Sequence, residues 1–234
     1  MLNNLSFQPF LTTGDVYYPK LVYVFYSNLR ITDNGIIHSA VKKVPIQIDS
    51  NFFFIMTNLE SQGVCFEVSM VDEWKLDYSS HDAKRMIYCD NVDIYGRILA
   101  GKMKVESCIW HNLIYRCVLS HCSNLAQTTK EGIILMWALL IGRKINWAHL
   151  IRNHMKRALR DNAPLPYPHL ITNIFDQFEI PIEDEPYEKH NIRNFQIGTE
   201  VIHSFGFVKN QNDEWMHKHD IAHQPIHYEG RPSP

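Results

Sequence analysis

The sequence contains few glycines, and none of them stands in a phosphate-binding pattern. Its ten glycines are scattered singly, and neither G-x-x-x-x-G-K-[ST] nor G-x-G-x-x-G occurs. No G-x-S-x-G motif marks a serine nucleophile, and no cysteine lies in a recognisable protease context. These absences exclude the common nucleotide-binding loops and argue against nucleophilic hydrolases. We therefore expect a protein that is not an enzyme, with no catalytic residue and no cofactor.

Long apolar runs are missing as well. The longest uninterrupted run, Ile133 to Ile141, has nine residues, whereas a helix needs roughly 20 to cross a bilayer. No N-terminal segment combines basic residues, an apolar run and a small-residue cleavage site, as a secretory signal would. The five cysteines are an odd number, which favours reduced thiols over a disulfide framework. We expect a soluble, intracellular protein without a membrane span.

The composition is that of a folded protein with no strong charge. Hydrophobic residues make up 45% of the 234 residues and aromatic residues 12%, which is ample for a core. The formal net charge of -2 provides no general attraction to nucleic acid or acidic membranes. A nucleic-acid partner would therefore need a local basic patch.

Apolar spacing predicts a mainly α fold, an irregular helical bundle of five or six helices. The clearest helices are expected over residues 105–119, 129–141 and 147–160, with Trp137 and Trp147 in the core. A small extended element is expected near residues 36–48, where Pro45 restricts the second β-prone run to a sheet edge. The fold class therefore depends on helices, with one minor β element.

Several residues predict where helices begin and end. Asp49, Ser79 or Ser80, and Asn146 are expected as N-caps. Thr128 and Glu131 match a capping box, in which each side chain bonds the backbone N–H of the other. Gly142 is expected to end the helix before it.

The chain divides into three parts by composition. Residues 1–17 are an N-terminal extension, residues 18–182 a helical domain, and residues 183–234 an acidic linker, a small apolar patch and a disordered, His-rich tail. The acidic linker predicts few contacts across it. Cutting the chain after Pro181 is therefore expected to leave a folded core.

Two groups of residues raise the question of a metal. One lies within fifteen residues and comprises Cys108, His111, Cys117, His121 and Cys122, a set of zinc-ligand types without a Cys-x2-Cys pair. The other is in the tail and comprises His217, His219, His223 and His227. We favour core cysteines and a solvated tail, and so expect no metal; a metal-dependent hydrolase remains the least favoured alternative.

Basic residues in the segment 147–160 raise the question of nucleic acid. Arg152, Lys156 and Arg160 are spaced by four, which predicts a ridge on the helix face opposite Trp147 and Leu150. With Arg157 they are the candidate nucleic-acid contacts, because such a ridge suits phosphates. The favoured interpretation is a solvated outer face whose cations complement the helix dipole.

Three segments together resemble a known family. They are Leu21 to Leu29 (L-V-Y-V-F-Y-S-N-L), a stretch that runs from Trp110 through Trp137 to Ile145-Asn146-Trp147 and His154-Met155, and Pro166 to Ile174. Together they resemble the plant transposon protein domain, found in retroelement-derived plant genes that include envelope-like open reading frames. The resemblance implies a non-catalytic protein-interaction or structural domain, with a protein partner favoured over nucleic acid. A nucleic-acid-associated module is the alternative.

Overall fold

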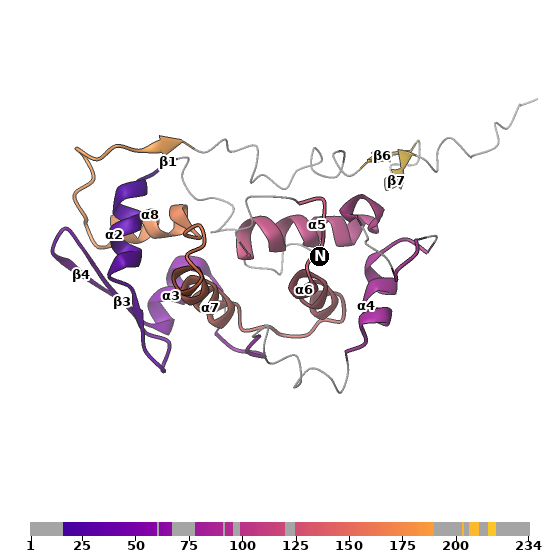
Figure 1. The fold of residues 1–234 in the computed structure, drawn as a ribbon, viewed down its shortest axis with the longest axis horizontal. Coiled ribbons are helices and arrows are strands. Elements are labelled where there is room, and N and C mark those ends of the chain that lie inside the picture. The colour runs from indigo at the N-terminus through magenta and orange to yellow at the C-terminus, as the bar shows by residue number, and fades with distance from the viewer. Residues whose placement is uncertain are drawn as a thin grey trace, which may run out of the picture.

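The computed structural model of the protein describes residues 16–59, 61–66, 78–90, 92–95, 99–119, 125–189, 203, 206–210 and 215–218 (Figure 1). These residues hold seven α-helices and three small antiparallel sheets. The fold is therefore α-rich and mixed, with one helix more than the five or six expected. That the helices form an irregular bundle stays a prediction.

Helices and strands alternate irregularly along the described part of the chain. The helices are α2 (Pro19–Ser27), α3 (Ser50–Thr57), α4 (Ser80–Ile87), the 3-10 turn η3 (Ala100–Lys102), α5 (Val105–Leu113), the π-helix η4 (Ile114–Val118), α6 (Lys130–Leu140), α7 (Trp147–Arg160) and α8 (Pro168–Gln177). The strands are β1 (Val16–Tyr17), β2 (Arg30–Ile31), β3 (Ile37–Val41), β4 (Val44–Ile48), β5 (Glu188–Lys189), β6 (Phe207–Lys209) and β7 (Trp215–His217).

One half of the molecule, the sheet half, consists of α2, β2 to β4, α3, α7 and α8 and lies at the left of Figure 1. Its sheet has the order β2-β3-β4, and α2 packs against β3. The pairing of Ile37 with Ile48 and of Ala40 with Pro45 confirms the extended element predicted near residues 36–48. Pro45 lies on the outer strand, where its missing N–H removes no bond from the ladder.

Local capping chemistry sets several of the helix boundaries. The side chains of Asp49, Ser79 and Asn146 accept backbone N–H groups at the starts of α3, α4 and α7. Gly142 follows α6 with φ +73°, and its N–H donates to Leu139 O at 3.1 Å. These four predicted caps are confirmed.

The other half, the helical half, consists of α4, α5, η4 and α6. The closest approach within it is at Gly132 of α6, where an added Cβ would lie 2.2 Å from the Tyr115 hydroxyl oxygen. Glycine is therefore required there by the Tyr115 ring and not by its backbone conformation.

The start of α6 differs from the predicted capping box. The N-cap is Thr129, whose hydroxyl accepts the Gly132 N–H at 3.1 Å. Thr128 instead bonds the Tyr88 hydroxyl at 2.7 Å, and Glu131 binds Arg157 at 3.2 Å. The prediction was wrong by one residue because tertiary partners occupy both expected box residues.

Segment 105–119, predicted as a helix, is mostly buried, but it is not one α-helix. It passes from α5 into the π-helix η4, where Tyr115 projects toward α6. The polar residues Ser107, His111 and Asn112 of this segment are also buried. The helix is therefore enclosed on its polar side as well.

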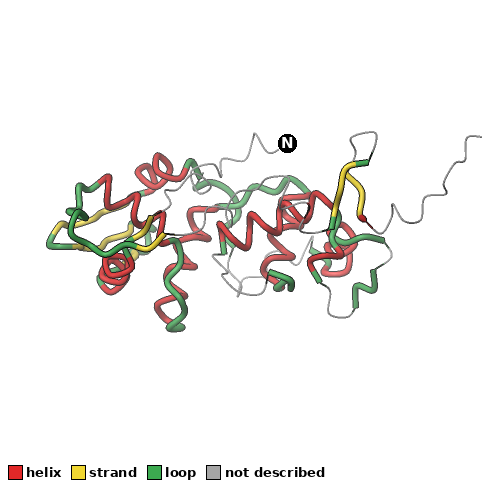
Figure 2. The backbone as a smooth tube through the Cα atoms, turned by 90° about the horizontal axis from the view of Figure 1, so that it is seen from above, coloured by secondary structure: helices red, strands yellow, loops and turns green. Residues whose placement is uncertain are grey.

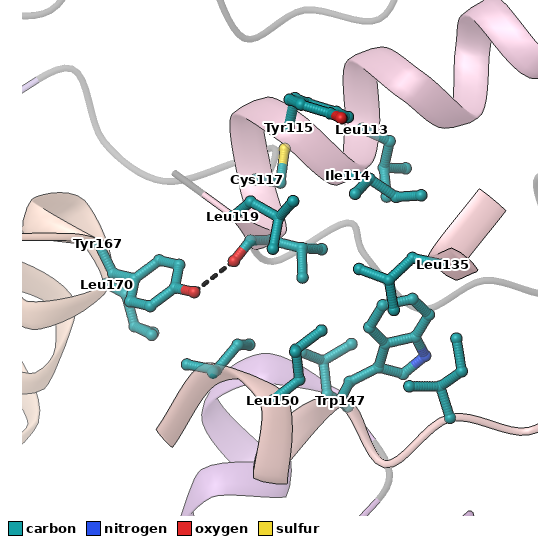
Figure 3. Close-up of a cluster of buried hydrophobic side chains, with 14 of the residues drawn as sticks. Leu113, Ile114, Tyr115, Cys117, Leu119, Leu135, Trp147, Leu150, Tyr167 and Leu170 are labelled. Atoms are coloured by element: carbon teal, nitrogen blue, oxygen red, sulfur yellow. Dashed lines mark hydrogen bonds between the residues drawn. The ribbon is translucent and has the colours of Figure 1, made fainter. Parts of the chain in front are cut away.

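The two halves meet in a cluster of apolar side chains (Figure 3). Figure 3 shows Leu113 and Ile114 of the α5–η4 segment, Leu135 of α6, and Trp147 and Leu150 of α7 converging on one interior. Trp137 and Trp147 are both buried, as predicted, with 5% and 7% of their surface exposed. The core therefore runs through both halves.

The chain returns to the sheet half after α8. Lys42 donates to Pro181 O at 2.8 Å and pairs with Glu185 at 2.7 Å, and β5 pairs with β1. Phe207 is buried as well, within a hairpin that lies toward the other end of the molecule (Figure 2). Contacts therefore cross the expected boundary at residue 182, while the three-part division itself stays a prediction.

Candidate functional site

The segments that carry the family resemblance meet at a buried hydrogen-bonded group, the polar node. Its members are Tyr26 of α2, Val118 of η4, His154 of α7, and Pro166 and Tyr167 before α8. The Tyr26 hydroxyl donates to Pro166 O at 2.7 Å, and the Tyr167 hydroxyl donates to Val118 O (Figure 3). His154 Nδ1 lies 2.9 Å from the Tyr167 oxygen. The node therefore joins the sheet half to the helical half.

Proton positions in the node follow from its donors. Burial raises the pKa of Tyr26 and of Tyr167 well above the ordinary value, so both keep their protons. The single proton of Tyr167 is donated to Val118 O. His154 Nδ1 must therefore donate to the Tyr167 oxygen, which fixes the orientation of the imidazole ring.

The position of Tyr167 requires a strained backbone conformation. It precedes Pro168 and adopts φ +57°, in the left-handed region that is unfavourable for a residue with a Cβ. The proline-containing connector between α7 and α8 therefore ends in a sharp turn. This turn lets the ring enter the interior, and its role could not be read from the spacing of the prolines.

An ion pair supports the same junction. Arg157 of α7 lies 3.2 Å from Glu131 of α6, with 31% and 12% of their side-chain surfaces exposed. A partly enclosed pair of this kind fixes the register of two helices more than an exposed pair would. The family-signature residues and their neighbours are thus arranged to hold the fold.

Comparison with known families shows the family to which the chain belongs. A family model described as the plant retrotransposon-related domain matches residues 3–181, well over half of the chain. The chain belongs to this family. The matched part of the plant retrotransposon-related domain includes every residue of the polar node. No curated protein and no solved structure matches the chain.

The predicted basic ridge of α7 is not continuous. Arg152 is buried and donates to Gly35 O at 2.6 Å and Ala148 O at 3.0 Å. Its guanidinium also lies over the Phe53 ring. The prediction was wrong for Arg152, because the turn before β3 encloses a side chain that spacing alone places outside.

The other three candidate nucleic-acid residues differ in their exposure and in their ion-pair partners. Lys156 is exposed, Arg157 binds Glu131, and Arg160 binds the adjacent Asp161 at 2.7 Å. Leu159 has 40% of its surface exposed, whereas Arg152 is buried, so the buried face of α7 is rotated toward Arg152. Nucleic-acid contact at these residues stays a prediction.

The candidate zinc residues are placed only in part. Cys108 and Cys117 are buried, and burial raises the pKa of each thiol to about 12. Burial lowers the pKa of His111 to about 4, and its ring stacks on Tyr115 at 4.3 Å. His121 and Cys122, like most of the tail histidines, lie outside the described residues.

Two further searches concern only the described part of the chain. Within it, no cluster of three or more His, Cys, Asp or Glu side chains is arranged to hold a metal ion. Among its helices, none is long and apolar enough to cross a membrane.

Helix α3 presents adjacent apolar side chains to solvent. In α3, Phe53 is buried and Phe52 packs against Phe178 at 5.3 Å. Phe54 and Ile55, which follow directly, have 42% and 69% of their surface exposed. The sequence indicated the N-cap of this helix at Asp49, but it could not show which side of the helix faces solvent.

Proposed function

We propose that this retrotransposon-related domain is a non-catalytic module that acts through contact with another protein. The observation that supports the proposal is the outer side of α3, where Phe54 and Ile55 are exposed. When a partner covers adjacent apolar side chains on a capped, packed helix, the free energy of the complex is lowered by about 25 cal/mol per Å² of surface removed from water.

The arrangement of the polar groups agrees with a non-catalytic role. The buried tyrosines of the polar node bond to backbone carbonyls and to one histidine, an arrangement that suits positioning of segments. The thiols of Cys108 and Cys117 are enclosed and protonated at neutral pH, which makes them poor nucleophiles. We therefore propose that these groups stabilise the fold.

Affinity capture with the full-length protein tests the proposal. Tagged wild-type chain would be compared, in plant cell extract, with Phe54→Ser/Ile55→Ser and with Tyr187→Ser, a control at a residue 56% exposed elsewhere. We expect a reproducible set of proteins that the double variant loses and the control retains. Both variants should melt close to the wild type, because the altered side chains are exposed.

The nucleic-acid alternative predicts a different result in the same experiment. Nuclease treatment would then remove the captured proteins, and Lys156→Ala with Arg160→Ala would mimic the loss. Retention of the same proteins by the α3 variant and all controls would contradict the proposal. Only Lys156 of the four candidate cations is both exposed and without a recorded ion pair among the described residues, so we rank nucleic acid second.

A further inference from the structure

A surface pocket of about 370 Å³ lies between α4 and the loop that follows it. His81 and Arg85 line it from α4, where a spacing of four places them on one face. Val92, Ile94 and Tyr95 line it from the loop. Its volume is within the range of small-ligand sites and is large enough for one or two side chains.

Fixed hydrogen bonds shape this pocket. Lys84 Nζ donates to Ile94 O at 2.9 Å, which ties the loop to α4. Lys104 Nζ donates to Arg85 O at 3.1 Å at the end of the helix. The Tyr95 ring leans on His81, with centroids 5.8 Å apart. The pocket is therefore held by side chains that do not need a ligand to order them.

The charges around the pocket leave one group available. Asp82 accepts hydrogen bonds from Ser79 and His81, and Asp93 accepts the Tyr95 N–H at 3.0 Å. Asp90 lies 3.9 Å from Lys104. The guanidinium of Arg85 is exposed and lines the pocket. After the hydrogen bond from Ser79, its charge helps to lower the pKa of Asp82, but no direct ion pair is recorded for it among the described residues.

We propose that this pocket binds an aspartate or glutamate side chain that a partner protein presents beside an apolar or aromatic residue. The planar guanidinium of Arg85 matches a carboxylate with two parallel hydrogen bonds. Tyr95, with 82% of its surface exposed, offers a ring for the neighbouring apolar side chain, and Ile94 offers a buried floor.

The rim of the pocket selects against a polyanion. Asp90 and Asp93 line the same pocket as Arg85, and their charges would repel successive phosphates of a nucleic acid while tolerating a single carboxylate. The inference rests on the proposed function for the class of partner, a protein. It concerns a different surface, since α3 belongs to the sheet half and α4 to the helical half.

A peptide titration of the full chain, followed by the amide signals of His81, Arg85 and Tyr95 in NMR spectra, tests this inference. The probe is the capped peptide acetyl-Phe-Glu-Leu-Glu-amide, and its glutamine counterpart is the matched control. Saturable shifts are expected only with the glutamate peptide. Arg85→Gln is expected to raise the Kd by about tenfold, and Arg30→Gln, which removes one charge in the sheet half, by less than about twofold.

Three results would overturn the inference. One is the absence of saturable shifts with the glutamate peptide, and another is equal weakening by Arg85→Gln and Arg30→Gln, which would mean unspecific charge attraction. The third is stronger binding of 5′-phosphorylated tetrathymidylate at the same signals. Arg85→Lys, which keeps the charge and loses the two-pronged geometry, should bind the peptide more weakly than the wild type. The α3 capture experiment has its own variants, so either result can fail without the other.

Discussion

The two halves of this domain keep their apolar interiors in place by different polar devices. In the sheet half, backbone pairing of β2 to β4 is combined with the buried Arg152 guanidinium, which binds carbonyl oxygens of Gly35 and Ala148. In the helical half, tyrosine hydroxyls hold the start of α6, Tyr88 on Thr128 and Tyr115 on Thr129. The polar node around Tyr167 connects the halves.

The two halves should differ in how strongly a side-chain substitution disturbs their structure. A sheet with its own ladder keeps its shape when one side chain is changed, because backbone bonds carry the register. Helices that pack through a few hydroxyls and one close glycine depend on those particular side chains. We therefore expect the helical half to be the more sensitive to conservative substitutions.

The largest effects should come from the two buried tryptophans. Trp137 lies within the helical half, where its ring meets Tyr78 at 5.2 Å, and Trp147 lies where the halves meet (Figure 3). Each Trp→Ala change is expected to lower the free energy of unfolding by about 3–5 kcal/mol. Urea denaturation would measure it, and unchanged stability of either variant would show that its ring does not fill the core.

Substitution of Gly132 should destabilise the helical half specifically. Alanine normally stabilises a helix interior by about 1 kcal/mol relative to glycine. Here the added methyl collides with Tyr115, and the net result is expected to be a loss of about 2 kcal/mol. Gly101→Ala is the control, because nothing lies within 4 Å of its added Cβ.

The sign of the change in stability caused by Gly132→Ala tests whether the Tyr115 ring is fixed against the start of α6. Thermal and urea unfolding of both variants should show a loss for Gly132→Ala and little change for Gly101→Ala. A gain in stability for Gly132→Ala would mean that the ring of Tyr115 moves freely and that the start of α6 does not depend on it.

The sequence predicted what is local in this fold. Asp49, Ser79, Asn146 and Gly142 were found because a cap depends on residues within one helical turn. The polyproline-like segment gave no sign of the left-handed turn at Tyr167. Local chemistry therefore predicted element boundaries well and the node poorly.

The wrong predictions are explained by contacts between residues that lie far apart in the sequence. Arg152 is enclosed by Gly35, a residue 117 positions away, and Thr128 is occupied by Tyr88, 40 positions away. The same holds for the Arg85 pocket, which depends on how the loop after α4 packs against that helix. For the candidate site as a whole, the N-cap of α3 was predictable, while its exposed side depended on packing.

A pH dependence should distinguish the helical half from the sheet half. Burial lowers the pKa of His111 from 6.5 to about 4, with Arg116 adding to the effect and the Gln127 backbone opposing it. The unfolded chain therefore takes up a proton first as the pH falls. The contribution of neutral His111 to the free energy of unfolding is complete above the pKa of the unfolded state. It is lost as the pH falls toward the pKa of the folded state, by about 2 kcal/mol between pH 6.5 and pH 5.

The variant His111→Gln provides the control for that dependence. Glutamine does not titrate, so the difference in unfolding free energy between the variant and the wild type should shrink as the pH is lowered from 7 to 5. Parallel pH profiles for the two proteins, measured by urea denaturation, would contradict the neutral, buried state of His111.

The smallest expected effect lies in the sheet half and has the opposite sign. Lys43 adopts φ +67° in the β3–β4 turn and is exposed, a conformation that favours glycine. Lys43→Gly is expected to stabilise the protein by about 0.5 kcal/mol after the added freedom of the unfolded chain is counted. Lys20→Gly, within α2, should instead destabilise by up to about 1 kcal/mol; losses of equal size would argue against the left-handed turn.

Native-state hydrogen exchange of Tyr167→Phe tests most directly the claim that the polar node makes one unit of the two halves. Loss of the hydroxyl leaves Val118 O and His154 Nδ1 without their buried partner, at an expected cost of about 2 kcal/mol. The account predicts that the slowest-exchanging amides of α2 and of α6 lose the same opening free energy, while Tyr187→Phe changes neither. A loss confined to α8, or to one half, would contradict it.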